Sequence, residues 1–258
     1  MSKIYDINGN ELSASVYKGK KISILGDSIS TFRGWIPEGN AVYYTGSNCG
    51  MTSVEFTWWK RLINALEMEL VVNNSWSGSR VAGNSASAGC NTRCTSLDVN
   101  GVVPDVIIVY LGINDFNNEV RLGSYDGKSM APSATTANTF REAYAIMLNK
   151  MMNKYKRAEI WCCTLPSCEK NGDIGAPEIN GNNVALLEFN DSIRYLANTF
   201  NAKIIELQSC GLTYHNQNIF MGDWNSGVST GLHPNPSGHA LMANHIIKTL
   251  DPSCQVRY

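Results

Sequence analysis

Residues 20–30 read Lys-Lys-Ile-Ser-Ile-Leu-Gly-Asp-Ser-Ile-Ser, a short apolar run between two lysines and a Gly-Asp-Ser turn. This pattern predicts a buried strand at 22–25, the first of a parallel sheet. In open α/β sheets, reactive groups collect beyond the carboxyl ends of strands, so we expect Ser28 to lie at such a place. The alternative is that Asp27 or Ser28 only caps a helix, and the rest of the chain decides between the two.

The remaining chain alternates apolar runs with amphipathic segments. Further strands are predicted at 69–73, 105–111, 159–164 and 203–207, and helices at 53–67, 138–155, 183–200 and 237–250. This alternation is typical of an α/β fold with about five parallel strands. We expect one domain over residues 1–258, extended at 1–17 by a hairpin that turns at Asn8-Gly9.

Loop lengths in this pattern are unequal. The predicted helix-to-strand connections are short, whereas those that leave each strand are long, and loops above about 12–15 residues are usually functional or disordered. If the strands are parallel, all the long loops lie on one rim of the sheet. The pattern therefore predicts an active site on that rim.

Composition excludes several classes of protein. The chain has 258 residues, 43% hydrophobic and 17% charged, with a formal net charge of −1. Nothing in this balance favours a nucleic-acid partner, and no apolar run approaches the roughly 20 residues of a membrane span. The first residues lack the apolar core of a signal peptide.

The eight cysteines give no metal pattern. Cys90 and Cys94 have no second pair or histidine at zinc spacing, so we expect no metal site. A Cys90–Cys94 disulfide remains an alternative for an oxidising compartment. Free thiols in a reducing compartment are favoured. We therefore slightly favour a cytoplasmic location, or secretion if a leader was removed.

Four segments of the expected rim carry residues suited to acyl transfer: Ser28, Gly78, Asn114 and His233. A serine hydroxyl becomes a good nucleophile when an imidazole takes its proton. The tetrahedral intermediate then needs donors for its oxyanion. The N–H groups of Ser28 and Gly78 and the amide of Asn114 are candidates, because glycine lets the backbone approach closely.

The same segments, Gly26-Asp27-Ser28-Ile29, Asn74-x-x-x-Gly78, Gly112-x-Asn114-Asp115 and His233-Pro234-Asn235, occur in the order of the SGNH (GDSL-type) hydrolase family. The chain resembles that family over residues 21–245. The resemblance implies a three-layer α/β/α sandwich like flavodoxin, with Ser28 as nucleophile and His233 as general base. It further implies an oxyanion hole of Ser28, Gly78 and Asn114, ester substrates, and no metal or organic cofactor.

One position departs from the family pattern. The family usually has an aspartate three residues before the histidine, where this chain has Thr230. Threonine cannot stabilise an imidazolium by charge. Three explanations stay open: a Ser–His dyad oriented by a backbone carbonyl, replacement by Asp223, or a weakened enzyme. The dyad is slightly favoured over Asp223.

Several residues on the expected rim loops are candidates for the substrate pocket: Trp35, Tyr43, Tyr44, Arg80 and Trp224. Mixed with many Asn, Ser and Gly residues, they favour a small acyl group, such as the acetyl group of a carbohydrate, over a long lipid chain. The expected partner is thus a small-molecule ester. The competing hypotheses are a non-catalytic binding protein on the same scaffold and, last, a nucleotide-binding flavodoxin-type module, which would need a glycine-rich phosphate loop that is absent here.

Overall fold

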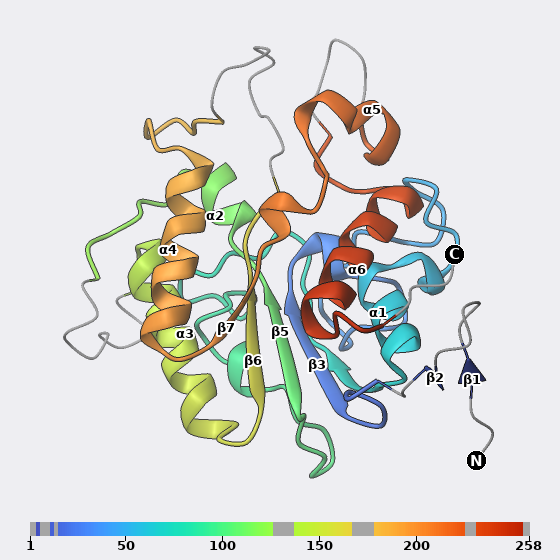
Figure 1. The fold of residues 1–258 in the computed structure, drawn as a ribbon. Helices are drawn as coiled ribbons and strands as arrows, with labels where there is room; N and C mark the ends of the chain where they lie inside the picture. The colour runs from blue at the N-terminus through green and yellow to red at the C-terminus, as the bar shows by residue number, and fades with distance from the viewer. Residues whose placement is uncertain are drawn as a thin grey trace.

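A parallel sheet forms the centre of the computed structural model, which describes residues 4–5, 11–12, 15–125, 137–166, 178–224 and 231–254. Its strands are β3 (Lys21–Gly26), β4 (Glu69–Asn73), β5 (Val106–Tyr110), β6 (Glu159–Cys163) and β7 (Lys203–Ile205). They lie in the order β4-β3-β5-β6-β7, and every neighbouring pair is parallel (Figure 1). This is the strand order of flavodoxin-like folds, so the predicted α/β class is confirmed.

Helices cover both faces of the sheet (Figure 1). On one face α1 (Trp58–Leu66) packs against α6 (Pro236–Leu250), and on the other α3 (Phe140–Lys154) packs against α4 (Leu186–Thr199). Trp58 and Trp59, the first two residues of α1, are fully buried in the core. Two short helices, α2 (Ile113–Asn117) and α5 (Gln217–Phe220), lie on the rim at the carboxyl ends of the strands.

Two elements near the start differ in detail from the prediction. The helix expected at 53–67 is a 3₁₀ turn at Val54–Phe56 followed by α1, because Thr57 between them is extended and its hydroxyl accepts the Lys60 N–H as a cap. The expected hairpin is present as β1 (Ile4–Tyr5) paired antiparallel with β2 (Glu11–Leu12). Its turn at Asn8-Gly9 lies outside the described residues.

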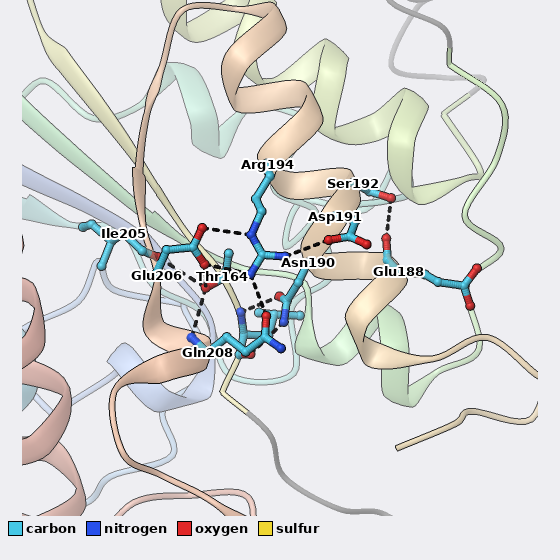
Figure 2. Close-up of polar contacts among 10 residues, drawn as sticks. Thr164, Glu188, Asn190, Asp191, Ser192, Arg194, Ile205, Glu206 and Gln208 are labelled. Atoms are coloured by element: carbon cyan, nitrogen blue, oxygen red, sulfur yellow. Dashed lines mark hydrogen bonds and ion pairs between the residues drawn. The ribbon is translucent and has the colours of Figure 1, made fainter. Parts of the chain in front are cut away.

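A network of polar side chains fixes the end of β7 against α4, as Figure 2 shows. The Arg194 guanidinium donates from Nε and Nη2 to the two carboxylate oxygens of Glu206, at 2.8 Å each, and from Nη2 to Gln208 Oε1 at 2.6 Å. Thr164, just after β6, accepts the Gln208 N–H at 3.0 Å. Paired donors of this kind give a well-defined geometry, so the network holds the β6 and β7 ends of the rim in place.

His239 on α6 is fully buried, and its Nδ1 accepts the backbone N–H of Trp58 at 3.2 Å. Burial, together with the charges of Arg61 and His233, lowers the pKa of His239 to about 3. In the unfolded chain a histidine has a pKa of about 6.5. Between pH 6.5 and the folded pKa of about 3, the unfolded chain therefore binds a proton at this position and the folded protein does not. The stability contributed by the neutral ring is therefore present above pH 6.5 and lost as the pH falls.

We expect His239→Gln to remove this pH dependence. The wild type should lose about 2–3 kcal/mol of unfolding free energy relative to the variant between pH 7 and pH 4.5. Urea denaturation of both proteins at a series of pH values measures the difference. Burial raises the pKa of Asp27 and Asp115 to about 7. These two carboxyl groups therefore add to stability as the pH falls, but they do so equally in both proteins. The prediction is contradicted if the difference in unfolding free energy between the wild type and the variant is the same at every pH.

Among the described residues, no helix has both the length and the apolar character needed to cross a bilayer.

Candidate active site

Ser28 begins a 3₁₀ turn directly after β3. The Asp27 side chain caps the turn by accepting the Ile29 N–H at 3.0 Å, and Ser28 is 3% exposed. Gly26 is required before it, because a Cβ there would lie 2.6 Å from the Ser30 hydroxyl oxygen. The strand end and the turn are therefore packed too closely for any other residue.

The end of this turn is held by side chains from neighbouring elements. The carbonyl oxygen of Ser30 accepts hydrogen bonds from Trp59 Nε1 at 2.9 Å and Asn73 Nδ2 at 2.8 Å. These donors come from α1 and from the end of β4. Ser28 thus lies on a turn anchored from two sides, and its position is set before any ligand binds.

The Ser28 hydroxyl meets the His233 ring, although the two residues are 205 positions apart in the chain. His233 Nε2 lies 2.9 Å from Ser28 Oγ, and Nδ1 lies 2.7 Å from Asp223 Oδ2. A carboxylate only accepts hydrogen bonds, so Nδ1 carries the proton and Nε2 is left to accept the serine hydroxyl. A hydroxyl, an imidazole and a carboxylate hydrogen-bonded in this order can activate the hydroxyl for nucleophilic attack.

Asp223 is fixed by the segment that carries the histidine. Its Oδ1 accepts the N–H of Leu232 at 2.9 Å and that of His233 at 3.0 Å. Burial raises the pKa of Asp223, but the hydrogen bonds from the His233 ring and backbone outweigh it, and the pKa is lowered overall. The carboxylate is therefore ionised at neutral pH beside the ring that it contacts.

The sequence slightly favoured a dyad whose histidine is oriented by a backbone carbonyl. In the structure this is wrong, because His233 Nδ1 contacts the Asp223 carboxylate. The Gly222 N–H donates to the His233 carbonyl oxygen at 2.8 Å, and Met221 forms a β-bridge with Pro234. This pairing brings residue 223 beside residue 233. Thr230, the other candidate for orienting the histidine, lies outside the described residues.

Tyr43 stacks on the His233 ring, with ring centroids 3.4 Å apart and an interplanar angle of 10°. Thr31 links it to the nucleophile, since its hydroxyl accepts the Tyr43 N–H at 2.9 Å and donates to the Ser28 carbonyl oxygen at 2.8 Å. Tyr43 was predicted only as a pocket residue. No sequence signal revealed this stacking, because the partner is nearly two hundred residues away.

Gly78 and Asn114 are tied to one another. Asn114, on α2, donates from Nδ2 to the carbonyl oxygen of Ser79 at 3.0 Å, which orients the amide and leaves its second N–H unused. Gly78 is exposed, with a φ of +76° that favours glycine. Within the described residues, the backbone N–H groups of Ser28 and Gly78 donate to no other group. These are the properties that donors to an oxyanion need.

Asp115, the residue after Asn114, holds the loop that follows Gly78. Its carboxyl group accepts the N–H of Val81 at 2.7 Å and that of Ala82 at 2.9 Å, and it is fully buried. Asp115 therefore has a structural role, because it bonds backbone N–H groups of this loop.

The residues expected to line a pocket differ in how far they are exposed to solvent. Tyr44 does not line an open pocket: it is fully buried and donates its hydroxyl to the Pro234 carbonyl oxygen at 2.9 Å, so this prediction is wrong. Trp35 and Trp224 are each 40% exposed, and Trp224 directly follows Asp223. Arg80 is also exposed.

A small apolar cavity lies among residues adjacent to the site in sequence. Its volume is only about 10 Å³, and its lining includes Ile29, Ile113, Met221, Leu232 and Pro234. Ile29 follows Ser28, Ile113 precedes Asn114, and two further lining residues flank His233. The cavity thus borders the segments that carry the polar residues of the site.

The cysteines of the described residues are free thiols, including Cys90 and Cys94. Burial raises the pKa of these two thiols to about 11 and about 12. In the same part of the chain, no group of three His, Cys, Asp or Glu side chains is arranged to hold a metal ion.

Comparisons with known proteins show the family of this chain. Residues 20–211 match the protein family described as GDSL-like lipase/acylhydrolase. A solved protein described as a GDSL-like lipase, from Bacteroides ovatus, is 28% identical with a TM-score of 0.65, and the match covers 90% of this chain and 98% of that one. A second, from Bacteroides uniformis, is 26% identical with a TM-score of 0.65, covering 91% and 96%.

A more distant likeness concerns the fold alone. A catalytic mutant of an acetylxylan esterase from Geobacillus stearothermophilus is 16% identical, with a TM-score of 0.58, and the match covers 94% of this chain and 100% of that one. No curated protein matches this chain significantly in sequence.

Proposed function

Because the chain belongs to the GDSL-like lipase/acylhydrolase family, we propose that it is a serine esterase that hydrolyses carboxylic esters through an acyl-enzyme on Ser28. The observation that carries this proposal is the continuous hydrogen-bonded chain from Ser28 Oγ through His233 to Asp223, at 2.9 and 2.7 Å. Its residues come from distant parts of the sequence, and the family match ends before His233.

In the first half of the reaction, Ser28 Oγ attacks the ester carbonyl carbon while its proton passes to His233 Nε2. The carbonyl electron pair moves onto the oxygen, which becomes an oxyanion. When this intermediate collapses, the bond to the alcohol breaks and the leaving oxygen takes the proton from Nε2. Asp223 keeps the proton on Nδ1 and stabilises the imidazolium that forms between these steps.

In the second half, a water molecule attacks the acyl group on Ser28 and gives its proton to His233. Collapse returns that proton to Ser28 Oγ and releases the carboxylic acid. In both halves the oxyanion accepts hydrogen bonds from the N–H groups of Ser28 and Gly78 and from the Asn114 amide. Donors already oriented, as the Asn114 bond to Ser79 suggests, need no reorganisation during the reaction.

We infer a short acyl group, such as acetyl, on a carbohydrate. The cavity lined by Ile29 and Ile113, the sequence neighbours of Ser28 and Asn114, is apolar and small, which supports a short acyl chain over a long one. The exposed indoles of Trp35 and Trp224 offer flat surfaces of the kind that pack against sugar rings. One protein with the same fold is an acetylxylan esterase, which makes acetylated sugars the first substrates to test.

The proposal is tested with p-nitrophenyl acetate, butyrate and octanoate, with acetylated xylo-oligosaccharides, and with a fluorophosphonate label. We expect hydrolysis that falls as the acyl chain lengthens, release of acetate from the sugar, and one label, on Ser28. Ser28→Ala should lose both activity and label, whereas Ser85→Ala, at an exposed loop serine, should keep both. Folded wild type with neither hydrolysis nor label would contradict the proposal and favour a non-catalytic binding protein.

A further inference from the structure

Arg93 is a buried arginine, 4% exposed, in a 3₁₀ turn of the loop between β4 and β5. Its Nη2 donates to the carbonyl oxygens of Gly26 and Asn74 at 2.6 and 2.5 Å. Its Nη1 donates to the hydroxyl of Ser79 at 2.9 Å and to the Ser87 carbonyl oxygen at 2.7 Å. One guanidinium group thus joins four points of the chain.

Such a group is costly to bury. A cation removed from water without a paired anion loses hydration that neutral acceptors restore only in part. Among the described residues, the hydrogen-bond acceptors of Arg93 are all neutral oxygens; the buried Asp27 carboxyl group attracts the guanidinium without a direct hydrogen bond. Burial lowers the pKa of Arg93 to about 10, which leaves the group charged at neutral pH. The four hydrogen bonds must therefore serve a geometry that an apolar residue could not provide.

The acceptors of Arg93 belong to the segments that carry the oxyanion donors. Gly26 is two residues before Ser28, and Ser79 follows Gly78. The Ser79 residue is shared: its hydroxyl accepts from Arg93, and its carbonyl oxygen accepts from Asn114 Nδ2. The guanidinium consequently contacts two of the three donor segments directly and the third through a single residue.

We propose that Arg93 is a positioning residue for the oxyanion hole. It holds the Ser28 turn, the Gly78 loop and the Asn114 amide at fixed separations, so that all three donors point at one anion position. The inference rests on the proposed esterase function and adds to it a residue that touches neither the substrate nor the reacting atoms. Errors of under an ångström in donor placement reduce transition-state stabilisation, whereas ground-state binding of the ester depends little on these donors.

The test compares Arg93→Lys and Ser79→Ala with the wild type. Lysine keeps the charge. Its single nitrogen, however, cannot reach all the acceptors that Nη1 and Nη2 of the Arg93 guanidinium contact. Ser79→Ala removes one Arg93 acceptor and keeps the Ser79 carbonyl oxygen, so it is expected to fold even where Arg93→Lys does not. We expect kcat to fall about 10- to 100-fold in Arg93→Lys and a few-fold in Ser79→Ala, with KM within about twofold in both.

A second measurement separates positioning from stability. A short alkylboronic acid forms a tetrahedral adduct with an active serine, and its affinity should fall in proportion to kcat in each variant. Arg194→Lys is the control for a hydrogen-bonded arginine away from the site: Arg194 donates to two carboxylates and one amide oxygen at the end of β7, three strands from β3 (Figure 2). It should lower the melting temperature and leave kcat and boronate affinity unchanged.

The outcomes are distinct. Lower kcat and lower boronate affinity at constant KM support the inference. Variants that melt earlier but keep wild-type kcat per folded molecule, or that change KM alone, overturn it while leaving the esterase function intact. A folded wild type that neither hydrolyses esters nor reacts at Ser28 overturns the proposed function, and this inference with it.

Discussion

Asparagine at position 223 is expected to lower kcat by about 10⁴-fold while the protein stays folded. The Asp223 carboxylate accepts the Nδ1 proton of His233 at 2.7 Å and so leaves Nε2 free to take the Ser28 proton. An asparagine amide has no charge to stabilise the imidazolium, and its N–H group favours the opposite tautomer. In that tautomer Nε2 already carries a proton and cannot act as the base.

The control variants separate this effect from loss of structure. Asparagine keeps one oxygen for the N–H groups of Leu232 and His233, which Asp223 Oδ1 accepts, so the loop should survive. Asp191→Asn, at an exposed aspartate on α4, should leave turnover unchanged. Thr230→Ala should also leave it unchanged. Wild-type turnover in Asp223→Ala would show that Asp223 does not orient His233. A dyad oriented by a backbone carbonyl would then describe the site.

Removal of the Asn114 amide is expected to lower kcat by about 10²- to 10³-fold, equivalent to about 2.7–4 kcal/mol of transition-state stabilisation, with little change in KM. The amide donates one N–H to Ser79, and in the proposed mechanism its other N–H donates to the developing oxyanion. The ester carbonyl in the ground state carries little charge, so the amide gains most of its interaction energy in the transition state. Steady-state kinetics of Asn114→Ala with a p-nitrophenyl ester measure the effect.

Two comparisons make this result specific. Asn114→Asp replaces the donor by an anion of similar shape and should lose at least as much activity as Asn114→Ala. Asn153→Ala removes an amide from the exposed side of α3, far along the chain from the site, and should keep wild-type kinetics. If Asn114→Ala raises KM and leaves kcat unchanged, Asn114 binds substrate and is not part of the oxyanion hole.

The strands were predictable because each is a short apolar run bounded by polar or turn residues. The run at 22–25 became β3, and the run at 69–73 became β4 with the same bounds. β3 is buried along most of its length and is therefore apolar, whereas β4, at the edge of the sheet, is only half-buried in its middle. Boundaries that depend on caps were less accurate: the extended conformation of Thr57 divides the helix expected at 53–67.

The positions of Ser28, Gly78 and Asn114 also followed from the sequence, since the carboxyl ends of parallel strands share one rim. Which side chain meets His233 did not follow. Thr230 stands at the usual spacing, yet Asp223 contacts the ring, because the pairing of Gly222 with His233 aligns the two segments. Such pairing between loop segments depends on the whole fold and leaves no periodic pattern in the residues.

Local sequence by itself therefore determined the secondary structure, the parallel α/β class and the serine, glycine, asparagine and histidine of the site. These features depend on apolar periodicity and on residue types that act within a few positions of one another. Only the tertiary structure decided that Asp223 contacts His233, that Tyr43 stacks on it, that Tyr44 is core, and that Arg93 contacts both Gly26 and Ser79. Each of these is a contact between segments far apart in the chain, and its energy exists only once the sheet and helices have brought those segments together.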